Sequence, residues 1–150
     1  MKKQIMYCVA LRHLSGIQKG IQGWHAADEY KIFHGDTPEH KQWLHYDKTV
    51  MLLQGNSVDL LKAAMYDLGE NEIPYSVFVE PDLGNTITAF CFLLDEEVWD
   101  TDTYPNEIPT MAFTNSVGKS EAQMAANANK YGFKTAFLRN FKNQFQLATN

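Results

Sequence analysis

Four short apolar runs, with two helical stretches between them, restrict what the first 94 residues of this chain can fold into. The runs have the length of buried strands and cover Gln4–Leu11, Lys48–Leu53, Tyr75–Val79 and Ile87–Leu94. Two successive strand–helix units favour parallel pairing of the first strands, with right-handed crossovers. The connection across residues 80–86 is short enough to join antiparallel neighbours instead. The sequence therefore predicts an α/β fold, with a mixed four-stranded sheet (β-α-β-α-β-β) and flanking helices.

Both predicted helices begin at a serine. Ser15 can accept a hydrogen bond from an otherwise unpaired backbone N–H, and so cap a helix that reaches about Tyr30. Ser57 caps the second helix, which Gly69 and Asn71 end and whose apolar stripe is Leu60, Leu61, Ala64, Met65 and Leu68. Residues 31–46 are polar and aromatic with a glycine and a proline among them, and we expect a loop there.

The last third of the chain has a different character. Residues 95–117 lack periodicity and predict a loop or an ordered excursion, after which a helix runs from Ser120 to Tyr131 with Gly132 as its C-terminal cap. Four phenylalanines then recur at every fourth position and predict one aromatic ridge along a helix: Phe133, Phe137, Phe141 and Phe145. We expect this ridge to pack in the core or against another subunit, with a membrane-surface helix as the alternative.

Length and composition agree with one domain over residues 1–150, with a core at about 3–94 and a C-terminal extension at 95–150. The chain is 45% hydrophobic and 21% charged, as in ordinary globular proteins. No apolar run approaches the ~18 residues of a membrane span. The basic start followed by apolar residues could open a signal peptide, but Arg12 and His13 interrupt it. Cys8 and Cys91 sit inside apolar runs as expected core residues, which favours a cytoplasmic location.

The charge distribution bears on possible partners. The net charge is -5, which is unfavourable for binding nucleic acid because contacts to phosphate carry most of that affinity. Residues 118–150 nevertheless hold one acidic residue, Glu121, and a group of basic ones: Lys119, Lys130, Lys134, Arg139 and Lys142. Two interpretations stay open, a basic tail that docks on the acidic body or on a second subunit, and a tail that contacts RNA.

Two separate segments carry a family resemblance. The first runs from Leu14-Ser15 through Gln22 to His25-Ala26, and the second is Asp82-Leu83-Gly84-Asn85-Thr86. Together they resemble the motifs Met-Ser-x-Gly-Lys-x-Ala-Ala-Gln-x-x-His-Ala and Asp-Ala-Gly-x-Thr-Gln of the type 2 peptidyl-tRNA hydrolases. The resemblance covers about residues 3–94, keeps the order of strands and helices, and is nearest to divergent, often phage-encoded relatives with a glutamine-rich first motif.

The resemblance implies a site for hydrolysis of the ester between a peptide and tRNA. Asp82 would be the base or would position the water, and Thr86 would be its hydrogen-bond partner. The family's Gly-Lys is Ile17-Gln18 here, and Lys19 stands one residue later, a rotation of ~100° and a rise of ~1.5 Å on a helix. Losing a charged donor to the oxyanion commonly costs about 10²–10³ in rate. Lys19 therefore either replaces the family lysine as a catalytic residue, or the hydrolase is weak, or the site only binds.

The remaining residues of the two motifs would bind substrate: Ser15, Gln18, Gln22, His25 and Asn85. The family resemblance implies no metal and no cofactor, and a homodimer. Without the resemblance, Asp82 fits an ordinary Pro-Asp-Leu-Gly turn and His25 fits a packing role. Two other motifs fail: Gly118-Lys119-Ser120 lacks the first glycine of a phosphate-binding loop, and His34, His40 and His45 lack partners for a zinc site.

Two functions follow as hypotheses. The first is a peptidyl-tRNA hydrolase-like enzyme. The second is a non-catalytic descendant of that fold which binds a nucleotide, an RNA-like ligand or a partner protein, for example a phage protein that sequesters a signal nucleotide.

Overall fold

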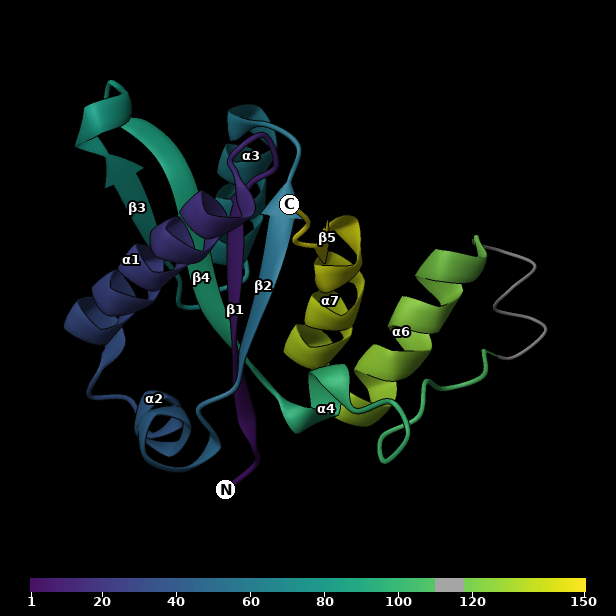
Figure 1. The fold of residues 1–150 in the computed structure, drawn as a ribbon. Coiled ribbons are helices and arrows are strands. Elements are labelled where there is room, and N and C mark those ends of the chain that lie inside the picture. Colours follow the sequence, from purple (N-terminus) through teal and green to yellow (C-terminus); the bar gives the residue numbers. More distant parts are fainter. Residues whose placement is uncertain (110–117) are drawn as a thin grey trace. The chain divides into compact units, whose positions relative to one another are not determined.

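The computed structural model describes residues 1–109 and 118–150, which form two compact units (Figure 1). The first unit comprises residues 3–94 and 145–150 together with Met1. The second comprises residues 95–144 together with Lys2, whose ammonium pairs with Glu97 at 2.8 Å.

The first unit is built on one five-stranded mixed sheet, so the predicted α/β class is confirmed. Its strands are β1 (Gln4–Leu11), β2 (Val50–Gly55), β3 (Ser76–Glu80), β4 (Thr86–Asp95) and β5 (Gln146–Leu147), in the spatial order β3-β4-β1-β2-β5. β1 and β2 are parallel and β3 and β4 antiparallel, as expected. The sheet has five strands rather than four because residues 146–147 add to the edge of β2, antiparallel to it.

Helix α1 (Gly16–His34) and helix α3 (Val58–Glu70) begin at the predicted caps. The Ser15 hydroxyl accepts from the backbone N–H of Gln18 at 3.2 Å, and the Ser57 hydroxyl accepts from that of Leu60 at 3.1 Å. Figure 1 shows α1 in front of the sheet and α3 behind it. Each face of the sheet is therefore covered by one long helix.

The loop expected over residues 31–46 is wrong. That stretch holds the last turn of α1, helix α2 (Pro38–Gln42) and a π-helical turn over Trp43–Asp47. Thr37 caps α2, and Pro38 occupies the first helical position, where its missing N–H costs nothing. The polar composition hid these helices because only His40 in α2 is fully buried.

The core follows the two-residue period of the strands. Alternate residues of β1 and β4 point to the α1 side and form one cluster: Met6, Cys8, Ala10, Ala89, Cys91 and Leu93, with Ala26 and Tyr30 of α1. Cys8 and Cys91 are buried free thiols, as expected of core residues. The Cys91 thiol donates to the Ala26 carbonyl at 3.0 Å, and burial raises its pKa.

The second unit contains α4 (Glu96–Trp99), α6 (Lys119–Tyr131) and α7 (Phe133–Phe141), followed by a 3-10 turn at Lys142–Gln144. The helix predicted from Ser120 is confirmed as α6. Of the two alternatives predicted over 95–117, a loop or an ordered excursion, the short helix α4 agrees with the second, and residues 110–117 lie outside the described part of the chain.

The aromatic ridge over residues 133–145 is also wrong. Its period holds only within α7, which ends at Phe141. Phe145 lies beyond the 3-10 turn and belongs to the first unit, where its ring meets that of Phe90 edge-on at 5.9 Å. Phe133 is exposed. The regular spacing therefore spans two different environments.

A bilayer-crossing helix would need both length and sustained apolar character, and no helix among the described residues has the two together.

Candidate functional site

The predicted site residues come from the start of α1 and from the β3–β4 turn. Figure 1 shows the β1–α1 connection and the β3–β4 turn at the same end of the sheet. In open α/β sheets, ligands are commonly bound outside the carboxyl ends of the strands. We therefore treat this end as the candidate site.

A buried hydrogen-bond network joins α1 to this turn. The Gln22 side chain is only 2% exposed, and its Nε2 donates to Glu80 Oε2 at 2.9 Å. Its Oε1 accepts from the Thr88 hydroxyl at 2.5 Å. Glu80 Oε1 in turn accepts from the backbone N–H of Asp82 at 3.2 Å. Gln22 therefore holds α1 against both β3 and β4.

Glu80 and Thr88 were missing from the sequence-based site. Glu80 directly precedes the turn motif, and this position was the one signal that could have indicated it. Hydrogen bonds from the Gln22 amide and then from the Asp82 N–H lower the pKa of Glu80, and the neighbouring His25 acts in the same direction. The carboxylate is therefore ionised at neutral pH. A lowered pKa makes it a weaker base than a general base poised near neutrality.

The turn itself holds three predicted site residues. It is a 3-10 turn over Pro81–Leu83, followed by Gly84 and Asn85 with φ values of 67° and 60°. The Thr86 hydroxyl donates to the Leu83 carbonyl at 2.5 Å and so closes the turn. Asp82 and Asn85 are exposed. Thr86 thus uses its proton within the turn rather than on Asp82.

Lys19 is directed elsewhere. Its side chain is 1% exposed, and its ammonium donates to Gln54 Oε1 at 2.9 Å and to the Thr149 carbonyl at 2.5 Å. Thr149 also donates its backbone N–H to Gln54 Oε1, at 3.1 Å. Gln54 is on β2 and Thr149 follows β5, whereas Asp82 follows β3 at the other edge of the sheet. Lys19 therefore links α1 to β2 and to the C-terminal segment.

The remaining predicted residues have local roles. The Ser15 hydroxyl caps α1, and the Gln18 side chain is exposed at the first turn of that helix. The His25 ring stacks on Phe78 of β3, with ring centroids 4.4 Å apart and an 18° angle between the planes. The structure thus brings Gln22 and His25 to Glu80, and Asp82, Asn85 and Thr86 into one turn.

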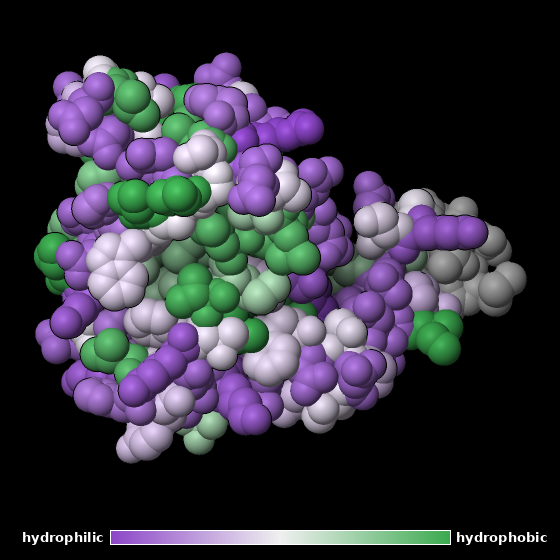
Figure 2. All heavy atoms as spheres, viewed as in Figure 1, coloured by the Kyte–Doolittle hydropathy of each residue, from purple (hydrophilic) through white to green (hydrophobic). Residues whose placement is uncertain are grey.

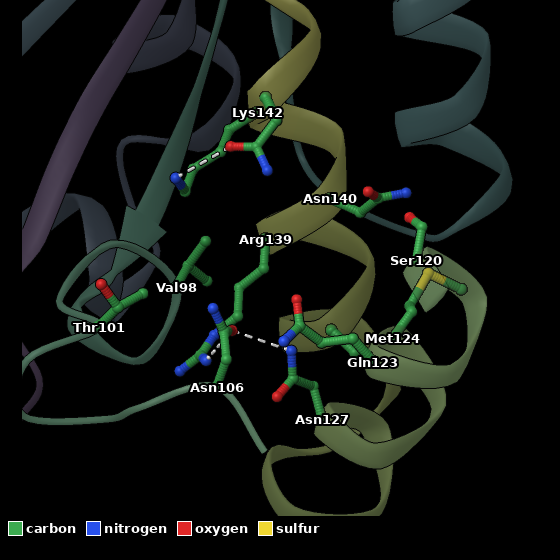
Figure 3. Close-up of a pocket in the computed structure, with 12 residues that line it drawn as sticks. Val98, Thr101, Asn106, Ser120, Gln123, Met124, Asn127, Arg139, Asn140 and Lys142 are labelled. Atoms are coloured by element: carbon green, nitrogen blue, oxygen red, sulfur yellow. Dashed lines mark hydrogen bonds between the residues drawn. The ribbon is translucent and has the colours of Figure 1, made fainter. Parts of the chain in front are cut away.

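The second unit has a polar pocket of its own, of about 180 Å³, between α6 and α7 (Figure 3). Its largest charged group is Arg139, whose guanidinium donates to the carbonyls of Glu97 and Tyr104 and to Asn106 Oδ1 at 2.5–2.8 Å. The same guanidinium lies 4.3 Å from the ring centre of Tyr131. Because these donors are already paired, and ligand pockets usually measure about 300–1,000 Å³, we interpret Arg139 as a brace of this unit.

The basic residues of the tail are partly used in the same way. Lys130 pairs with Glu107 at 2.7 Å, and this contact raises the pKa of Lys130. Arg139 is buried and Lys130 is paired with Glu107. Two of the five basic residues of the tail are therefore not free positive charges for contact with RNA. Among the described residues, no cluster of three His, Cys, Asp or Glu side chains is placed to hold a metal ion.

Comparisons with known proteins add no function. No family model matches the chain, and no curated protein matches it. Among solved structures, a protein of unknown function, Atu0240 from Agrobacterium tumefaciens strain C58, is similar at 10% identity and a TM-score of 0.45. The match covers 73% of this chain and 100% of that one.

Proposed function

We propose that this chain is a binding protein, on a scaffold that resembles the type 2 peptidyl-tRNA hydrolases, and that it does not hydrolyse peptidyl-tRNA. Ester hydrolysis needs an oriented water, a base with a suitable pKa and a donor for the developing oxyanion. The observation that carries the proposal is the position of Lys19, whose ammonium is buried against Gln54 and Thr149.

The other groups at this end support the same conclusion. The lowered pKa of Glu80 weakens it as a base, and the Thr86 hydroxyl is used to close the turn. Gln18, in the family's lysine position, is a neutral side chain that can donate a hydrogen bond but no charge. Of the predicted site residues, Gln18, Asp82 and Asn85 have exposed side chains that a ligand could contact. Contact with tRNA or a nucleotide, a homodimer and a cytoplasmic location remain predictions.

The test is hydrolysis of an N-acetylated aminoacyl-tRNA by the wild-type chain and by Asp82→Asn. An active type 2 hydrolase serves as positive control, and Asp67→Asn, at an exposed position of α3, as the matched substitution. We expect release at the spontaneous rate with all three forms of this chain. Release above that rate by the wild type, abolished by Asp82→Asn and kept by Asp67→Asn, would overturn the proposal and restore the enzyme hypothesis.

A further inference from the structure

An apolar groove of about 530 Å³ lies on the first unit, away from the β3–β4 turn. Helix α1 forms one wall, the π-helical turn and β2 form the other, and Cys8 of β1 is at the floor. Its lining residues are Cys8, Gly20, Gly23, Trp24, Ala27, Trp43, Leu44, Lys48, Val50 and Leu52. Figure 2 shows a hollow on this face in which apolar side chains gather, with polar residues around it.

Two glycines of α1 line the groove and have different surroundings. A side chain at Gly23 would meet Cys8 and Leu52 at 3.2 and 3.1 Å, so α1 approaches the sheet closely at that point. A Cβ at Gly20, one turn earlier, would meet no atom within 4 Å, and this position faces open space in the groove. The volume is within the range of about 300–1,000 Å³ that is typical of small-molecule sites.

Each wall of the groove carries a tryptophan, and a hydrogen bond holds one of the two rings in place. The Trp43 indole donates to the Thr49 carbonyl at 2.8 Å, which sets the orientation of its ring. Trp24 is 72% exposed on the opposite wall, and Ile17 and Ile21 continue the same apolar line along α1. Apolar patches of this kind on a protein surface mark interaction sites.

One cation stands at the groove. Lys48 ends the π-helical turn in the left-handed conformation, with φ of 55°, and its backbone N–H donates to the Trp43 carbonyl at 2.8 Å. The carboxylate of the neighbouring Asp47 accepts hydrogen bonds from the Gln4 backbone N–H at 2.8 Å and from the Gln42 side-chain amide. Within residues 1–109 and 118–150, no carboxylate pairs with the Lys48 ammonium.

A smaller hollow of about 130 Å³ shares Trp24, Ala27, Trp43 and Leu44 with the groove. It reaches His40, which is 1% exposed, and within the described residues neither ring nitrogen of His40 makes a hydrogen bond. Burial lowers the pKa of His40, although the nearby Gly35 backbone acts in the other direction. The neutral ring therefore has one donor and one acceptor in this hollow, which Asp28 and Lys31 also line.

We propose that the groove between α1 and β2 binds a small aromatic acid, with its apolar ring system against Trp24 and Trp43 and its anionic group paired with Lys48. The walls bury an aromatic body, and Lys48, the cation that lines the groove itself, selects an anion over a neutral or cationic ligand. This site is separate from the β3–β4 turn, so it stands whether or not the chain hydrolyses peptidyl-tRNA. A negative result in the ligand-binding test below would therefore not bear on the hydrolysis test, and a negative hydrolysis result would not bear on ligand binding.

The test uses two fluorescent probes with the same aromatic body. 8-Anilinonaphthalene-1-sulfonate carries an anion, and N-phenyl-1-naphthylamine lacks it. We expect the full chain to bind both saturably, at one per chain, and 1-naphthoate to displace the sulfonate. Lys48→Met should weaken sulfonate binding about two- to fivefold, the range for an exposed ion pair, and leave the neutral probe unchanged. Lys62→Met, an exposed lysine of α3, is the matched control and should change neither.

Gly20→Leu fills the groove from α1 and also removes a helix-interior glycine, so it blocks the site without destabilising the fold. It should weaken both probes at least tenfold, whereas Gly69→Ala on α3 should leave both unchanged. Equal binding by Gly20→Leu and wild type would overturn the proposal. So would a chain that elutes as a dimer and binds neither probe, because the apolar line of α1 would then be covered by a second copy.

Discussion

Gly20 and Gly23, the two glycines in the interior of α1, give the sharpest prediction about stability. Replacing either by alanine removes the entropic cost of a helix-interior glycine, which stabilises the fold by about 0.5–1 kcal/mol. At Gly20 nothing opposes this gain, because the new Cβ would have no atom within 4 Å. At Gly23 it would lie 3.2 Å from Cys8 Cβ and 3.1 Å from Leu52 Cδ1. Carbon atoms in contact normally stay about 3.5–4.0 Å apart.

The leucine methyl can rotate away from a Cβ at Gly23, but Cys8 Cβ is fixed to β1, so the helix has to move. Overpacking of this kind costs about 1–3 kcal/mol. Because the glycine term is common to both variants, the difference between Gly20→Ala and Gly23→Ala isolates that cost, with Gly23→Ala the less stable. In a chain of 150 residues this is a separation of several degrees in Tm.

The assay is thermal and urea unfolding of the two variants beside wild type, with Gly69→Ala as control. Its Cβ would meet only Tyr75, at an ordinary 3.9 Å. Gly20→Ala and Gly69→Ala should both be more stable than wild type. A Gly23→Ala chain as stable as Gly20→Ala would refute the close approach of α1 to β1 and β2, and with it the wall of the groove.

Two further predictions concern the hydrogen-bond networks. Because the pKa of Glu80 is lowered in the folded state, its stabilising effect is present above the ordinary pKa of a glutamate and is lost as the pH falls through the folded value. Glu80→Gln should therefore be less stable than wild type at pH 7, with a gap in urea midpoint that narrows as the pH falls below the ordinary pKa of a glutamate; a constant gap would contradict the network. Arg139→Lys should destabilise the second unit by about 2–4 kcal/mol, since lysine cannot bond Glu97, Tyr104 and Asn106 together. Faster amide hydrogen exchange over residues 96–109 and 133–141 would show this loss of stability. Unchanged exchange in Arg139→Lys would contradict the role of Arg139 as a brace.

The strands and helix starts of the first unit were predictable because their signals are local. An apolar run marks each of the first four strands, and Ser15 and Ser57 mark the helix starts. α2 also has a local signal, Thr37 followed by Pro38, but the polar composition around it favoured a loop. β5 could not be found, because two exposed residues acquire strand geometry only by pairing with β2, more than 90 positions earlier.

The candidate site shows the same division. The two motifs adjoin the end of β1 and the end of β3, and the structure has the start of α1 and the β3–β4 turn at one end of the sheet. The partners of Gln22 were not predictable, because Glu80 and Thr88 are 58 and 66 positions away. The shift from Gln18 to Lys19 predicted a rotation round α1. Where the Lys19 ammonium then binds could not be predicted, because its partners Gln54 and Thr149 lie 35 and 130 positions from Lys19.

The position of the Lys19 ammonium is the central claim, and nitrogen-15 NMR of the lysine side chains tests it most directly. An ammonium that donates to Gln54 Oε1 and the Thr149 carbonyl exchanges slowly with water, and should give a protected signal that disappears in Lys19→Met. We predict that Gln54→Leu abolishes the protection and that Asp82→Asn leaves the signal unchanged. A Lys19 signal that is unprotected, or that shifts in Asp82→Asn and not in Gln54→Leu, would place the charge at the β3–β4 turn and contradict the account.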